Sequence, residues 1–183
     1  MALTWKQLLF ILIALVCFGF LMRLIPHPPN ATPITALALV GSLYLGRKYA
    51  LFLPLIALAL SDFFIGFYDW KVMVSVYFSF ALIALFSWVL KKYRTFLPIA
   101  TTIIASSLFF FFVTNTAVWL FSPWYEKTLT GLLYSLELGI PFLRNMLMGD
   151  LVYTFGLIAV FETARAFAQV KIASLMCMPF SHK

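Results

Sequence analysis

The sequence predicts an all-α fold, a polytopic integral membrane bundle of about six transmembrane helices with a short, broken second helix. Of its 183 residues, 64% are hydrophobic and only 10% are charged, whereas about a quarter of the residues in a soluble domain are charged. The mean hydropathy is +1.02, and the apolar residues form six segments separated by prolines, glycines and charges. The length suits one domain, so residues 1–183 are expected to form a single membrane domain.

Five of the six segments are long enough to cross a bilayer. At about 1.5 Å per residue, a helix needs roughly 20 residues to cross a hydrocarbon core of about 30 Å. The first segment has no small-residue cleavage site, so it is expected to remain as a helix rather than to be removed as a signal peptide. The predicted long helices cover residues 7–25, 49–67, 72–90, 96–121 and 142–165.

The second segment follows a proline-rich break. Four prolines within residues 26–33 fix φ and disfavour helix in the residues before them, so this stretch is not expected to be helical. Thr32 is expected to cap the next helix, with Pro33 at its first position. That helix, residues 33–46, is roughly 20 Å long and too short to span alone. Irregular backbone at this depth must be buried in protein or line a cavity, so the break is predicted to mark a binding site.

The longest connection, residues 122–141, contains a segment of helical character at residues 128–138. This segment carries Glu137 and is followed by Gly139 and Pro141, so it is too short to span the bilayer. We expect an interfacial helix here, lying over the outer mouth of the bundle, where it could serve as a lid.

The placement of lysine and arginine predicts that both termini face the cytoplasm. With a cytoplasmic N-terminus, nine of the thirteen basic residues lie on the inner side, and the opposite orientation reverses this bias. The basic residues occur singly or in pairs between apolar segments, which is typical of cytoplasmic loops and argues against a nucleic-acid partner. The four basic residues on the outer side are Arg23, Lys71, Lys127 and Arg144.

The same topology gathers polar side chains in the outer half of the bundle. A carboxylate such as that of Asp62 costs of order 2.5–3.5 kcal/mol within a membrane helix, so it is expected to face the interior and to have a partner. The candidate ligand-binding residues are His27, Asn30, Asp62, Asp69, Asn115, Trp119, Arg144, Asn145 and Asp150.

The charged candidates also have structural explanations. Asp62 could contact a solute or a cation, but an internal ion pair explains it equally well. Asp69 would share the face of Asp62 if the helix continued through Gly66. Arg144 is the expected counter-charge, for Asp62 or another carboxylate, and its guanidinium could also bind a ligand carboxylate or phosphate. An arginine extending toward the outer interface is the alternative for Arg144.

The uncharged candidates divide in the same way. Asn30 and His27 lie in the proline-rich break, where they could contact a ligand or only fix their own loop. Asn115 and Trp119 are one helical turn apart and present an amide beside an aromatic wall, which suits a flat or partly apolar ligand. Contact with lipid is the alternative for this aromatic helix.

The sequence contains no signature of catalysis. There is no nucleophile elbow, no paired metal-binding histidine motif and no glycine-rich phosphate loop, so an enzyme is the least favoured class. With two histidines and two cysteines, a metal cluster and a cofactor site are not expected. Cys17 lies within the first apolar segment and Cys177 in the C-terminal tail, so a disulfide between them is not expected.

Four stretches of the sequence carry a family resemblance. They are residues 23–39 with the Pro-His-Pro-Pro-Asn motif, residues 54–66 with Ser-Asp-Phe-Phe-Ile-Gly, residues 113–119, and residues 140–150. Over about residues 20–160 the chain resembles a family of small, uncharacterised bacterial inner-membrane proteins described as transport proteins. This resemblance implies a multi-pass protein of the bacterial inner membrane.

The size and the six-helix plan also resemble the substrate-binding (S) components of energy-coupling factor transporters. That resemblance implies a ligand pocket near the outer face and separate ATPase and scaffold subunits that supply energy. The Ala-x-x-x-Ala pattern that many such components carry on their first helix is absent from residues 7–25, so the sequence does not indicate how the chain would dock on that scaffold.

Two functions from different classes follow from these patterns. The first is a substrate-binding or transport component for uptake of a small solute, such as a vitamin-like micronutrient, in contact with the lipid bilayer. The second is a structural or assembly membrane protein whose polar residues only hold helices together. An outer cavity lined by polar residues would favour the first, and a sealed interior with paired charges would favour the second.

Overall fold

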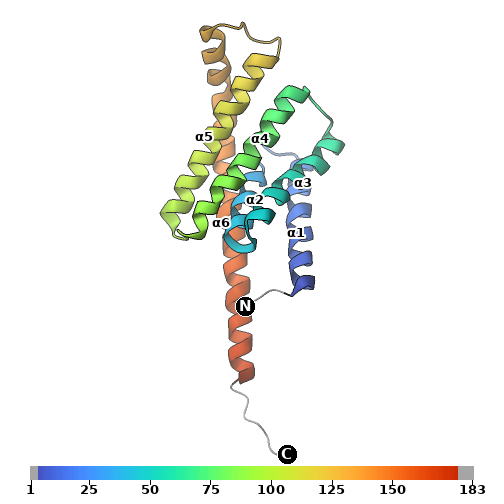
Figure 1. Cartoon of the computed structure of the whole chain (residues 1–183), viewed down its shortest axis with the longest axis vertical. Coiled ribbons are helices and arrows are strands. Elements are labelled where there is room, and N and C mark those ends of the chain that lie inside the picture. The colour runs from blue at the N-terminus through green and yellow to red at the C-terminus, as the bar shows by residue number, and fades with distance from the viewer. Residues whose placement is uncertain (1–3, 177–183) are drawn as a thin grey trace, which may run out of the picture.

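The computed structural model describes residues 4–176, and all regular secondary structure in that range is helical (Figure 1). Five helices are long and apolar enough to cross a membrane. Two short elements interrupt this pattern, a π-helix after α2 and a 3₁₀-helix after α4. The elements are α1 (Trp5–Leu24), α2 (Ile34–Val40), the π-helix η1 (Gly41–Leu45), α3 (Arg47–Ile65), α4 (Trp70–Phe86), the 3₁₀-helix η2 (Ser87–Lys91), α5 (Phe96–Phe121) and α6 (Leu129–Met176).

The predicted short second helix is confirmed, and it lies at the centre of the bundle. Every residue of α2 is buried, and α2 packs against α3 and α6 (Figure 1). The end of α2 lies very close to α3, and this approach requires glycine at position 41. A Cβ added to Gly41 would lie 2.9 Å from the Cα of Ala50 in α3. The expectation that Thr32 caps this helix is wrong. Pro33 occupies the cap position without a side-chain hydrogen bond, so the helix begins one residue later than predicted.

Gly66 ends α3 and separates two of the candidate carboxylates. Its φ of +108° lies in the region that favours glycine, and α3 stops at Ile65. Asp69 therefore does not continue the face of Asp62. Instead, the Asp69 carboxylate caps α4 by accepting hydrogen bonds from the backbone N–H groups of Lys71 and Val72, at 2.9 and 3.2 Å.

The last two predicted helices are one helix. The interfacial helix expected at residues 128–138 and the spanning helix expected at 142–165 are both parts of α6, which has 48 residues and contains Pro141. Proline removes one backbone donor, but the rest of the helix keeps its hydrogen bonds and packs along α5. At about 1.5 Å per residue α6 is roughly 72 Å long, more than twice the thickness of a hydrocarbon core.

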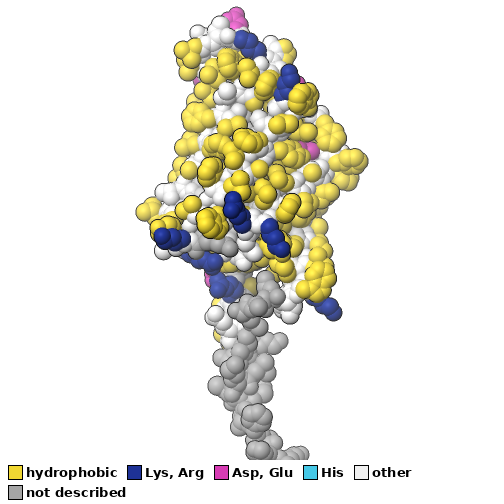
Figure 2. Space-filling view, in the orientation of Figure 1, with side chains coloured by type: hydrophobic (Ala, Val, Ile, Leu, Met, Phe, Trp, Pro, Cys, Tyr) yellow, Lys and Arg dark blue, Asp and Glu magenta, His cyan; other side chains and the backbone are white. Residues whose placement is uncertain are grey.

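Apolar side chains cover most of the visible surface, and lysine and arginine gather near its lower margin (Figure 2). The start of α3 carries Arg47 and Lys48, and the connection between η2 and α5 carries Lys92 and Arg94. We call these four residues the basic end of the bundle. The start of α1 lies toward the same end, and the last turns of α6 extend beyond it (Figure 1). Cys17 is exposed and free, and Cys177 lies outside the described residues.

Candidate functional site

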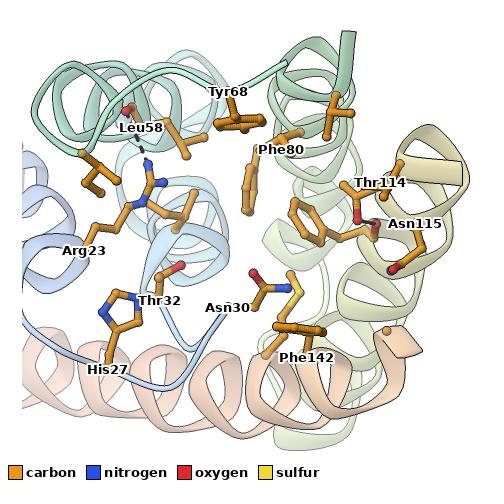
Figure 3. A pocket seen from close by; sticks show the side chains of 18 of the residues that line it. Arg23, His27, Asn30, Thr32, Leu58, Tyr68, Phe80, Thr114, Asn115 and Phe142 are labelled. Atoms are coloured by element: carbon orange, nitrogen blue, oxygen red, sulfur yellow. Dashed lines mark hydrogen bonds between the residues drawn. The ribbon is translucent and has the colours of Figure 1, made fainter. Parts of the chain in front are cut away.

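A cavity of about 1030 Å³ lies at the end of the bundle away from the basic end. It is formed where α1 and α3 end, where α4 begins, and where α5 meets the first turns of α6. The loop between α1 and α2, residues 25–33, closes one side of it. Figure 3 shows side chains from these elements projecting into one shared space. The proline-rich break therefore lines a cavity, as irregular backbone deep in a bundle is expected to do.

The loop has a defined conformation that directs two polar side chains at the cavity. Asn30 adopts a left-handed φ of 65°, which asparagine tolerates better than most residues. Backbone hydrogen bonds from Ala31 to Pro28 and from Thr32 to Asn30, both 3.0 Å, close the turn around it. The Asn30 side chain is exposed and points into the cavity (Figure 3).

His27 presents one defined ring nitrogen. Its Nδ1 lies 2.6 Å from the carbonyl oxygen of Ile25. A carbonyl can only accept, so Nδ1 carries the proton, and in the neutral ring Nε2 is then an acceptor. His27 also lines the cavity, beside Arg23 (Figure 3). The loop thus offers one amide and one imidazole acceptor to the same space.

An ion pair connects the cavity wall to the interior. Arg23 Nη2 lies 2.8 Å from Asp62 Oδ1, and Arg23 Nη1 donates to Ser61 Oγ over 2.6 Å. The second carboxylate oxygen of Asp62 accepts a hydrogen bond from the Tyr77 hydroxyl at 2.9 Å. Asp62 is 1% exposed and lies behind Arg23, which lines the cavity. The expected pairing of Asp62 with Arg144 is wrong, because Arg23 is its counter-charge.

Aromatic side chains form much of the apolar wall. The rings of Phe80 and Phe110 pack with their centroids 4.8 Å apart, and Phe142 faces them across the cavity (Figure 3). Tyr68, in the connection between α3 and α4, also lines the space. Burial, reinforced by the negative charge of Asp62, raises the pKa of Tyr68 to about 12. Tyr68 is therefore a neutral phenol at physiological pH.

Asn115 and Trp119 are predicted to contact the same ligand, but in the structure they lie in different parts of the fold. Asn115 lines the cavity, but its Nδ2 donates to the Phe111 carbonyl over 2.8 Å. Its Oδ1 lies against α6, where a Cβ added to Gly139 would come within 2.5 Å of it. Trp119 is not part of the cavity wall. Its Nε1 donates to the Glu126 carbonyl over 2.8 Å and so holds the connection between α5 and α6.

The structure brings three of the nine candidate residues to the cavity wall, namely His27, Asn30 and Asn115. Asp62 reaches the cavity only through Arg23. The other five lie elsewhere: Asp69 and Arg144 are exposed, Asn145 and Trp119 are half-buried, and Asp150 is buried beside Ser107. Whether any of them binds a ligand stays a prediction. Among residues 4–176 no group of three or more histidine, cysteine, aspartate or glutamate side chains is arranged to hold a metal ion.

Several residues that shape the cavity are not among those predicted from the sequence. The sequence predicts Arg23 only as an outer-side charge, although it is the one outer basic residue placed in the last turn of a long apolar helix. Its position next to the proline-rich break was the available signal. The aromatic residues carried no signal, because phenylalanines occur on every face of these helices. Only packing decides which rings face the cavity.

Comparison with known proteins gives a family but no activity. No curated protein and no solved structure matches the sequence significantly. One family model, described as a family of unknown function (DUF6580), matches residues 4–173. The match spans nearly the whole chain and covers all the residues that form the cavity. The chain therefore belongs to this family of unknown function, DUF6580.

Proposed function

We propose that the protein is a membrane-embedded component that binds a small solute for uptake, with the cavity as its binding site. The volume of about 1030 Å³ supports this proposal most directly, because pockets for small molecules typically measure about 300–1,000 Å³. The mixture of an apolar wall and a few convergent polar groups is also typical of small-molecule sites. A bundle stabilised only by packing has no need for a hollow of this size.

The charges around the cavity favour a solute without a strong net charge. Among the described residues that line the cavity, Arg23 is the only lysine, arginine, aspartate or glutamate, and Asp62 balances its charge. Asn30 and the Nε2 of His27 supply hydrogen-bonding groups, and the rings of Phe80 and Phe110 supply a stacking surface. A small molecule with a flat, partly apolar body and polar substituents suits these groups, as a vitamin-like micronutrient would.

The distribution of charge supports an orientation for this binding step. Basic residues of membrane proteins are enriched on the cytoplasmic side, and the basic end lies opposite the cavity. In this orientation the cavity opens toward the outside of a bacterial inner membrane, where a solute to be imported would arrive. The sequence carries no nucleotide-binding motif, so separate ATPase and scaffold subunits are the proposed energy source.

A structural or assembly role is the competing function, and one observation favours it. Arg23, Asp62 and Tyr77 satisfy one another and connect three helices without any ligand. Such a network also serves a protein that only holds helices together. The two functions differ in whether a solute stabilises the folded chain.

A thermal-shift screen of the purified full-length protein tests the proposal. Vitamins, their precursors and related flat micronutrients are added singly, and a bound solute raises the unfolding midpoint by mass action. At about 100 times its dissociation constant, a ligand stabilises by about 2.7 kcal/mol. Asn30→Ala should reduce the shift. Asn145→Ala, which removes a half-buried amide away from the cavity, should leave it unchanged.

Two results would remove this assignment. One is that no solute in the screen raises the midpoint, although the protein unfolds cooperatively. The other is that a stabilising solute acts equally on Asn30→Ala and Asn145→Ala, because binding would then occur outside the cavity. The first result would favour the structural role, and the second would place solute binding outside the cavity.

A further inference from the structure

Asp150 lies in a second polar site that is separate from the large cavity. It is in the middle of α6, where this helix packs against α2 and α5, and it is 1% exposed. Ser107 of α5 donates a hydrogen bond to Asp150 Oδ2 over 2.8 Å. Asp150 does not line the cavity. Its carboxyl group therefore needs an explanation other than solute contact from within that space.

No positive side chain balances this carboxyl group. Within the described part of the chain the ion pairs are Arg23–Asp62 and Arg165–Glu162. The two helices packed against Asp150, α2 and α5, contain no ionisable side chain at all. On α6 itself the nearest charged residues are Arg144 and Glu162, and both are exposed. An ionised carboxylate buried in such surroundings is strongly unfavourable unless a cation compensates for its charge.

Two buried hydroxyl groups near Asp150 have no fully formed hydrogen bond. Thr154, four residues further along α6, lies on the same face of the helix, and Thr35 of α2 lies at the edge of hydrogen-bonding distance from the carboxyl group. They are 0% and 1% exposed, and neither side-chain oxygen makes a hydrogen bond of acceptable geometry within residues 4–176. Unsatisfied buried polar groups commonly mark the place of a water or an ion.

We propose that Asp150, Ser107, Thr35 and Thr154 form a desolvated site for a monovalent cation, Na⁺. The ligand atoms that these four side chains offer are all oxygen atoms, which hard cations prefer. The single carboxylate balances a single positive charge. A proton on Asp150 would also neutralise the carboxylate, but its single O–H group could donate to only one of the neighbouring hydroxyl oxygens. A sodium ion could coordinate the oxygen atoms of all four side chains.

The position of the site in the fold is consistent with this assignment. Thr35 belongs to the short helix α2, which continues into the π-helix η1 at Gly41. Interrupted helices near the middle of a bilayer supply coupling-ion sites in secondary transporters, and π-helical turns occur frequently at functional sites. The sodium site does not depend on the proposed solute, because the two sites share no residue.

The test compares thermal unfolding of the purified full-length protein in sodium, potassium and choline chloride. Ionic strength and pH are held constant. Sodium is expected to raise the unfolding midpoint in a saturable manner, and more strongly than potassium or choline does. Thr154→Val keeps the shape of the side chain but removes an oxygen ligand, so it should weaken the sodium half-saturation by about tenfold or more. In choline this variant should be at least as stable as wild type, because it removes an unpaired hydroxyl group.

Asp150→Asn provides the second variant. Asparagine keeps the size of the side chain and can still accept a hydrogen bond from Ser107, but it has no charge. The sodium response should disappear, while unfolding in choline should occur no earlier than in wild type. The matched control is Glu137→Gln, which neutralises an exposed carboxylate on the same helix and should keep the full response.

Three outcomes would overturn the proposal. The midpoint could respond equally to the three salts, Asp150→Asn could keep the sodium response, or lower pH could stabilise the protein with no dependence on sodium. The last outcome would show that Asp150 takes up a proton instead. If Asp150→Asn does not fold, the sodium half-saturation of Thr154→Val still decides between these results.

Discussion

At the residue scale, the Arg23–Asp62 pair both fixes the bundle and forms part of the cavity wall. Arg23 lies in the last turn of α1, Asp62 lies near the end of α3, and Tyr77 on α4 completes the contact. Both carboxylate oxygens of Asp62 are used, and the guanidinium of Arg23 also binds Ser61. Because the Asp62 carboxylate is buried and Arg23 is only partly exposed, the carboxylate depends on Arg23 for compensation of its charge.

Removing one partner of this pair should therefore be costly, and removing both should be less so. Arg23→Gln leaves the Asp62 carboxylate buried without its counter-charge, so we expect a loss of about 3–5 kcal/mol in the free energy of unfolding. Asp62→Asn should cost a comparable amount. The double variant should lose much less free energy of unfolding than the sum of the two single losses, since neither charge then remains buried without its partner. Chemical unfolding in detergent measures all three variants as a double-mutant cycle.

Arg144→Gln is the control for this cycle. Arg144 is exposed, and its substitution should change the free energy of unfolding by no more than about 0.5 kcal/mol. Strict additivity of Arg23→Gln and Asp62→Asn would contradict the pairing.

The sequence located part of the cavity but not the charges behind it. Asn30 and His27 were predicted from the prolines around them, since a break in a membrane helix must be buried or line a cavity. The position of Arg144 near the start of the predicted last helix makes it the expected partner of Asp62. The depth and direction of a side chain depend on helix packing, however, and the sequence alone does not state which of four outer basic residues reaches Asp62.

At the element scale, the loop between α1 and α2 rests directly on α6. A Cβ added to Gly149 would lie 3.0 Å from the Cα of Ala31, which is a backbone atom and cannot move like the end of a flexible side chain. Gly149 therefore admits the backbone of the loop that carries Asn30.

Gly149→Ala should loosen this contact. We expect a destabilisation of about 1–3 kcal/mol, typical of overpacking, together with faster hydrogen exchange in residues 25–33. Gly156→Ala is the matched control on the same helix, because nothing lies within 4 Å of the Cβ that it would add. That variant should be neutral or stabilise by about 0.5–1 kcal/mol, as alanine favours helix over glycine. Equal behaviour of the two variants in calorimetry and exchange would contradict the close contact.

Helix boundaries were predicted where composition changes sharply and missed where packing overrides local preference. The predicted helix at residues 96–121 matches α5, which lies between charged and polar connections. Gly139 and Pro141 indicated a helix end, yet α6 continues through both. The close fit of Gly139 against Asn115 favours continued helix there, and this contact joins residues distant in sequence. The π-helix at Gly41–Leu45 had no local signal either, because its geometry follows from packing against α3.

At the scale of the whole molecule, charge and cavity lie at opposite ends. The basic end carries Arg47, Lys48, Lys92 and Arg94, whereas the cavity lies beside the proline-rich loop and the connection between α5 and α6. The buried carboxyl group of Asp150 lies on α6, which packs against α2. Uptake requires the cavity to face the side from which the solute arrives, so the orientation of the bundle is the assumption that most needs a direct measurement.

Cysteine labelling in intact cells provides that measurement. Glu126→Cys and Thr95→Cys place single exposed thiols at the cavity end and the basic end, in a background where Cys17 and Cys177 are replaced by serine. A membrane-impermeant maleimide should label Glu126→Cys in intact cells and Thr95→Cys only after the membrane is permeabilised, because basic loops stay in the cytoplasm. The reverse labelling pattern would show that the cavity opens toward the cytoplasm. A solute could then not enter it from outside, and binding for uptake would be excluded even if the cavity held a ligand in detergent.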